Sequence, residues 1–234
     1  MRERRRRLAT VLAIVFVLLS GVSVNTLQHR ASPSSTPSTV SSAVATGSAA
    51  DTLQKLAVKG RAPKTGYART QFGDGWENLG DCDVREHVLQ RDLSAVKTRS
   101  ATDCTVLSGT LHDPYTSKTI SFTRGPGSSA AVQIDHVVAL SDAWQTGAQQ
   151  LSATTRAQLA NDPLELLAVD GPTNQAKGDG DAATWLPPNK SYRCAYVARQ
   201  IAVKQKYQLW VTLAERSAMQ GVLGGCAGQA LPTG

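Results

Sequence analysis

The chain has 234 residues, enough for one domain with a sizeable core. Its formal net charge is +7, but residues 1–30 hold six Arg and one Glu, and the remaining residues carry 19 basic and 17 acidic side chains. Composition therefore excludes a strongly basic folded body, and a nucleic-acid function has to be argued from a site.

The first fifty residues do not have the composition of a globular domain. Arginines within residues 2–7 precede the uncharged, largely apolar stretch Leu8–Val24, which predicts a secretory signal peptide or an N-terminal membrane anchor over 1–30. Residues 31–50 contain only Ala, Ser, Thr, Pro, Val and Gly and are expected to form a disordered linker. The folded domain is then 51–230, either secreted or held at the membrane surface outside the cytoplasm by the anchor.

Four cysteines lie in the part of the chain that would be exported: Cys82, Cys104, Cys194 and Cys226. An even number in an oxidising compartment, with no Cys-x-x-Cys pair, favours two disulfides over a zinc site. The sequence allows three pairings. We favour Cys82–Cys104 and Cys194–Cys226, because each of these bonds joins neighbouring elements.

The first half of the domain combines short helices with strands. Asp51 begins a short helix, and Asp83 with Glu86 forms a capping-box pattern that predicts a helix to about residue 93. The other elements expected here are a packed, aromatic and glycine-rich loop at 66–76, a β-hairpin formed by 104–111 and 119–124, and an extended segment at 130–140.

The second half is expected to be mainly helical. Ser141 and Ser152 are predicted N-caps of helices that end near residues 149 and 161. The other expected elements are a strand at 164–169, a turn at 170–181, the longest helix at 190–208 and a last helix at 211–220. The predicted class is therefore α+β.

Two short stretches carry the chemistry. Asp135 and His136 lie together in an apolar run, and Asn174 and Lys177 follow about forty residues later in the predicted turn. A carboxylate, a neutral imidazole and an amide oxygen are suited to metal-assisted hydrolysis. Oxygen ligands favour a hard cation such as Mg²⁺, and the imidazole can take a proton from water near neutral pH.

The stretch "IDHVVALSDAW", followed by "LELLAVDGPTNQAKGDGDAATWLPP", resembles the HNH (ββα-metal) nuclease signature, and it is similar to the HNH domain of RNA-guided DNA nucleases. Most of residues 66–226 resembles a family of exported bacterial HNH-endonuclease-like proteins, related to a C-terminal domain of modification-dependent restriction enzymes. Flanking stretches such as "CDVREHVLQRDL" and "YRCAYVARQ" carry this second likeness. The resemblance implies an HNH core with an added N-terminal β-hairpin and C-terminal helices.

The resemblance also assigns roles. His136 becomes the general base, and Asp135 and Asn174 become the ligands of a divalent metal, expected to be Mg²⁺. No histidine follows His136, so a zinc or nickel site with two histidines is disfavoured. The implied activity is a monomeric, secreted or envelope-tethered endonuclease that hydrolyses phosphodiester bonds, in DNA in preference to RNA. The alternative is an exported binding module that kept the HNH scaffold without turnover.

Two cationic residues are candidate substrate contacts. Lys177 is either a phosphate contact or a solvated turn residue. Arg85 either reaches the scissile phosphate as a bidentate donor or forms an ion pair within its helix. The acidic residues Asp179 and Asp181 are expected to be turn formers or an N-cap rather than ligands.

Overall fold

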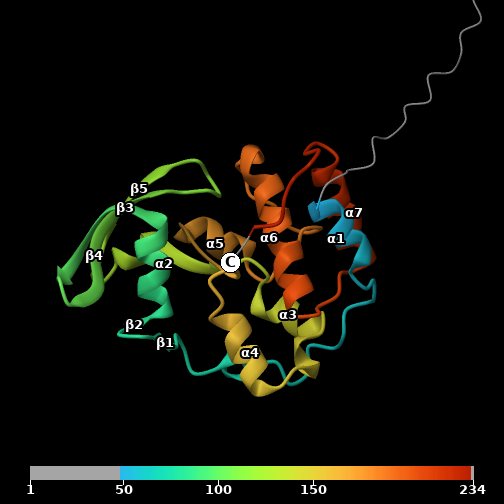
Figure 1. The fold of residues 1–234 in the computed structure, drawn as a ribbon, viewed down its shortest axis with the longest axis horizontal. Helices are drawn as coiled ribbons and strands as arrows, with labels where there is room; N and C mark the ends of the chain where they lie inside the picture. Colours follow the sequence, from blue (N-terminus) through green and yellow to red (C-terminus); the bar gives the residue numbers. More distant parts are fainter. Residues whose placement is uncertain (1–47, 233–234) are drawn as a thin grey trace, which may run out of the picture. The chain divides into compact units, whose positions relative to one another are not determined.

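The computed structural model describes residues 48–232 (Figure 1). The expected signal or anchor over 1–30, and the linker as far as residue 47, lie outside the described residues. The helices are α1 (Ser48–Lys55), α2 (Val84–Asp92), α3 (Leu140–Gln145), α4 (Ala153–Ala160), α5 (Gly171–Lys177), α6 (Arg193–Lys206) and α7 (Leu213–Leu223). The strands are β1 (Asn78–Leu79), β2 (Cys82–Asp83), β3 (Leu93–Ser100), β4 (Asp103–His112), β5 (Thr119–Thr123), β6 (Val132–His136) and β7 (Leu166–Asp170). This mixture of helices and small sheets confirms the α+β class.

Helix α1 begins before the expected domain boundary at residue 51. Its residues Ala49 and Ala50 are buried in the same core as residues of α6 and α7. The last residues assigned to the linker therefore belong to the folded domain.

Two hydrophobic cores lie on opposite faces of the β6–β7 pair. The larger core is built mainly by α1, α3, α4, α6 and α7, and the smaller core by α2, β4 and β5. Along β7, Leu166 and Ala168 pack into the smaller core, whereas Leu167 and Val169 pack into the larger one. The alternation follows from the two-residue period of a strand, and burial of both faces explains the unbroken apolar run. Figure 1 shows α2 with β3, β4 and β5 at one side and α1, α6 and α7 at the other.

The predicted hairpin is part of a three-stranded antiparallel sheet in the order β3-β4-β5. Strand β3 was not expected, because most of its side chains are polar and exposed. Asp83 caps α2 by accepting from the backbone N–H of Glu86, as predicted. The Glu86 carboxylate does not complete a capping box; it is buried and accepts from the backbone N–H of Val106 and from Arg124.

The second half follows the prediction in part. Ser152 caps α4 and strand β7 is present, but Ser141 lies inside α3 instead of capping it. The expected turn at 170–181 is wrong, since most of it forms α5. Asp170 caps this helix by accepting from the N–H of Thr173, and Pro172 lies in its first turn. A proline there is favourable, because its missing N–H would be unpaired in any case.

Both disulfides have the predicted pairing. Cys82–Cys104 joins β2 to β4, and Cys194–Cys226 joins the start of α6 to the segment after α7. No cysteine in residues 48–232 is free.

Candidate active site

The last two residues of β6 are the predicted Asp-His pair. Antiparallel pairing with β7 places Asp135 opposite Leu167 and His136 opposite Leu166. Successive side chains of a strand project to opposite faces, so Asp135 lies on the face of the larger core and His136 on the face of the smaller one. Because both faces are packed, the strand holds the two side chains in fixed directions.

His136 is a buried, neutral imidazole. Its Nε2 lies 3.0 Å from the carbonyl oxygen of Ala160 at the end of α4, and because a carbonyl only accepts, Nε2 carries the hydrogen and donates it. Nδ1 therefore keeps its lone pair. Burial, followed by the positive charge of Arg69, lowers the pKa of His136 from 6.5 to about 3. The Trp76 ring lies parallel to the imidazole, with ring centroids 5.7 Å apart.

Asp135 is buried with two donors. Lys177 Nζ donates to Asp135 Oδ1 at 2.8 Å and to the backbone oxygen of His136 at 2.6 Å, and the Tyr115 hydroxyl donates to Oδ2 at 2.5 Å. Burial and the Asp135 carboxylate raise the pKa of Tyr115 well above its ordinary value, so this hydroxyl remains a donor. The side chain of Lys177 is fully buried. The substrate contact expected of Lys177 does not fit this position, because its ammonium group is committed to the site's own carboxylate.

Asn174 lies on α5, one turn before Lys177. Its Nδ2 donates to Oε1 of Gln133 on β6 at 3.0 Å. This bond fixes the orientation of the amide and leaves the lone pairs of Oδ1 available to a ligand. Helix α5 thus brings the predicted Asn174 to the strand that carries Asp135 and His136.

These groups line a cleft of about 610 Å³, whose walls include Asp135, His136, Asn174 and three basic residues, Lys64, Arg69 and Arg85. Lys64 pairs with Asp179 at 2.9 Å, and Arg85 pairs with Glu86 at 3.1 Å. Among residues 48–232, Arg69 has no hydrogen-bond or ion-pair partner.

Arg69 and Trp76 were missed by sequence reasoning. They lie in the stretch 66–76, which was interpreted as a packed loop. The signal that points to them is that this stretch lies within residues 66–226, the part of the chain that carries the family resemblance.

The residues present fit a hard cation by donor type. Asp135 offers a carboxylate with lone pairs beyond the two that accept hydrogen bonds, and Asn174 offers an amide oxygen. Magnesium keeps several waters and needs few protein ligands. Within residues 48–232, no group of three or more His, Cys, Asp or Glu side chains is placed to hold a metal. Lys177 competes with a cation for Asp135.

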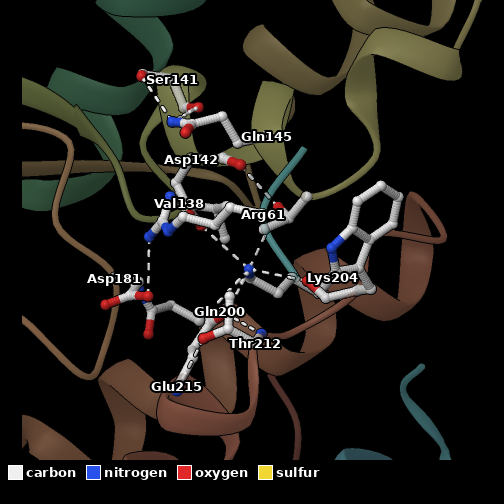
Figure 2. A network of polar contacts seen from close by, with 12 residues as sticks. Arg61, Val138, Ser141, Asp142, Gln145, Asp181, Gln200, Lys204, Thr212 and Glu215 are labelled. Carbon is white, nitrogen blue, oxygen red and sulfur yellow. Dashed lines mark hydrogen bonds and ion pairs between the residues drawn. The ribbon is translucent and has the colours of Figure 1, made fainter. Parts of the chain in front are cut away.

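A group of charges, buried except for Arg61, lies behind one wall of the cleft, and we call it the α3 charge network; Figure 2 shows its contacts. Lys204 Nζ lies 3.1 Å from Asp142 Oδ2 and 2.8 Å from Glu215 Oε1. Arg61 bridges Asp142 on α3 and Asp181 after α5, at 2.9 Å to each. The network therefore joins the segment that leads to Lys64 and Arg69 to the helix and loop that border the cleft.

Comparison with known proteins agrees with the resemblance. Residues 83–222 match the family described as GmrSD restriction endonucleases, C-terminal domain. The chain is also 36% identical over 213 residues to an uncharacterized secreted protein of Arthroderma benhamiae, a match that covers 90% of this chain and 99% of the relative. That relative is fungal, so proteins similar to this chain are not confined to bacteria. No solved structure matches the chain.

Proposed function

Because the chain belongs to the family of GmrSD restriction endonuclease C-terminal domains, we propose that it is an exported, metal-dependent HNH-type endonuclease that hydrolyses phosphodiester bonds, in DNA in preference to RNA. The order of β6, β7 and α5 supports this proposal, since two antiparallel strands and a following helix carry Asp135, His136 and Asn174. We propose that these three elements are the ββα-metal core.

The observation that carries the proposal is the state of His136. The imidazole is neutral, its Nε2–H is held by the Ala160 carbonyl, and the residue lines the cleft. A base with a free lone pair at Nδ1 can take the proton from a water molecule as that water attacks the phosphorus atom. Trp76 and the carbonyl of Ala160 fix the ring, so little reorganisation precedes proton transfer.

The cation would be held by the Asp135 carboxylate and the Asn174 amide oxygen. When bound, it supplies positive charge for the phosphate and the leaving oxygen. Arg69 and Arg85 contribute the protein's own positive charge. Arg69 has no partner in the described chain, and Arg85 shares the single carboxylate of Glu86 with Arg124, so one positive charge of that trio is uncompensated.

Export is part of the proposal. The two disulfides and a relative named as a secreted protein support an extracellular location. In the described part of the chain, the helices are all too short or too polar to cross a bilayer.

The rival is a binding module without turnover. The Lys177–Asp135 ion pair favours it, because that pair neutralises the carboxylate without a metal. A plasmid-nicking assay with added Mg²⁺ or EDTA separates the two functions. His136→Ala should lower the rate about 100-fold or more, the usual scale for a lost general base. His112→Ala, on the exposed end of β4, is the matched control and should cut like the parent. If folded His136→Ala cuts DNA and RNA as fast as the parent, the catalytic assignment is wrong; if the parent binds DNA but never cuts it with any divalent metal, the binding module replaces the enzyme.

A further inference from the structure

We propose that the pocket next to His136, which we call the ring pocket, binds one nucleobase of the substrate beside the scissile phosphate. The ring pocket has a volume of about 150 Å³, and its walls include Arg69, Phe72, Trp76, His136, Leu140 and Ala160. The proposal rests on the proposed nuclease function and adds to it a contact with a base.

The ring pocket is an extension of the cleft. Arg69, His136 and Leu140 line both spaces, so the imidazole stands at the boundary between them. A phosphate opposite His136 would have Arg69 as a neighbour. One of the nucleosides attached to that phosphate would then lie over the entrance of the ring pocket.

The walls are suited to a planar ring. Trp76 lies parallel to His136 and also packs against the smaller core, so its position is fixed. Phe72 is buried and makes edge contacts with Tyr67 and Trp144, at centroid distances of 6.4 and 6.3 Å. A cavity of about 150 Å³ is large enough to hold a benzene-sized ring. Aromatic side chains are the usual platform for bases of single-stranded or unpaired nucleic acid, because every base has a π-face.

The loop between Phe72 and Trp76 keeps this space open. Gly75 has φ +140°, a backbone conformation that L side chains rarely adopt, and no heavy atom lies within 4 Å of the position that a Cβ would occupy. Glycine is therefore required by the backbone rather than by crowding. The loop passes the pocket without a side chain at this position.

The test combines a change in the protein with a change in the substrate. The full substrate is a short DNA strand in which one linkage is a natural phosphodiester and all others are methylphosphonates. Two further substrates are identical except that each lacks one base, on one side or on the other side of that phosphodiester. Ala160→Leu fills the ring pocket from α4 but keeps the backbone carbonyl that binds His136. Ala153→Leu makes the same substitution at an exposed position of the same helix and serves as the control.

For the parent and for Ala153→Leu, removing the base on one side should lower kcat/KM about tenfold or more, the factor that base stacking on an aromatic side chain provides. With the full substrate, kcat/KM of Ala160→Leu should be lower than that of the parent by a similar factor. Removing the same base should then change kcat/KM of Ala160→Leu little. This non-additivity is the signature of direct contact between the filled position and the base. Equal losses on base removal in the parent and in Ala160→Leu would overturn the proposal. Trp76→Ala gives a second cycle if Ala160→Leu does not fold.

The same cycle on Kd, measured by fluorescence anisotropy in EDTA, separates this proposal from the proposed function. Coupling in Kd without any cleavage in Mg²⁺ would keep the ring pocket and reject the nuclease. Cleavage that depends on His136 but shows no coupling in either measurement would keep the nuclease and reject the ring pocket.

Discussion

Replacing Lys204 by Met should strongly destabilise the protein, although this lysine is outside the cleft. Its side chain is fully buried and Nζ contacts Asp142, Glu215 and the carbonyl oxygen of Trp210. Although burial opposes its charge, the two carboxylates hold the pKa of Lys204 above its ordinary value. Met occupies a similar length but leaves both carboxylates without this cation.

Removing one partner of a buried ion pair costs about 3–5 kcal/mol, because the other charge remains desolvated. For a domain of this size, about 1 kcal/mol corresponds to roughly 2–4 °C in Tm, so Lys204→Met should melt roughly 6–20 °C below the parent. Lys206→Met is the matched control on the same helix. Lys206 is half-exposed, and its buried partner Asp162 also accepts a hydrogen bond from the Tyr207 hydroxyl, so the loss of Lys206 should cost clearly less, about 1 kcal/mol.

The loss of stability in Lys204→Met should also depend on pH. Burial raises the pKa of Glu215 to about 7, against the effect of Lys204. A carboxyl group whose pKa is higher in the folded than in the unfolded protein takes up a proton on folding, so its stability contribution grows as pH falls from about 7 towards 4.5. Without Lys204 this pKa rises further, and the destabilisation should therefore be smaller at pH 5 than at pH 8.

Urea denaturation at both pH values measures these differences. Glu215→Gln in the Lys204→Met background removes the stranded charge and should restore part of the stability. If Lys204→Met and Lys206→Met lose the same stability, or if Glu215→Gln restores nothing, the α3 charge network does not stabilise the fold as argued.

Three further expectations concern the site and the disulfides. Because the pKa of His136 is lowered to about 3, the folded protein binds fewer protons than the unfolded chain between pH 6.5 and 3, so the parent loses stability as pH falls. Urea denaturation should show that the parent loses about 3 kcal/mol more stability than His136→Gln when the pH falls from 7 to 4.5. An equal dependence of stability on pH in the two proteins would contradict the buried neutral imidazole. Replacing Cys194 and Cys226 together by Ser opens a loop with a sequence separation of 32 residues and should lower the free energy of unfolding by about 3–4 kcal/mol, measured by thermal denaturation. An unchanged Tm would show that the bond does not restrict the unfolded chain. Lys177→Met should have a lower Tm than the parent in EDTA, and added Mg²⁺ should raise its Tm more than that of the parent, because Asp135 loses its internal cation. An equal rise in Tm with Mg²⁺ would show that Asp135 does not hold the metal.

The predictions that succeeded rest on local signals. Ser152 caps α4 through a hydrogen bond within the first turn, and β7 is an apolar run that its neighbours bury on both faces. Such patterns are complete within a few residues. The favoured disulfide pairing also rests on short separations, since each bond joins elements that are close in the chain.

The predictions that failed concern features that the tertiary structure decides. The stretch after Asp170 is rich in glycine and polar residues and suggests a turn, yet packing against β6 and β7 makes it a helix and buries Lys177. Strand β3 is a polar edge strand whose pairing with β4 compensates for its weak pattern. Arg69 reaches the surroundings of His136 from a distant part of the sequence, and no local period shows such a contact.

The position of β6 between two cores has a consequence for when the molecule can act. An amide in a strand that is hydrogen-bonded to β7 and covered on both faces exchanges with solvent only when both cores open. The amides of β6 that donate to β7 should therefore be among the slowest to exchange, at rates set by global unfolding. Partly folded forms that keep one half of the domain would have no assembled Asp135–His136 pair. For the proposed exported nuclease, cleavage of nucleic acid would thus be possible only after folding is complete.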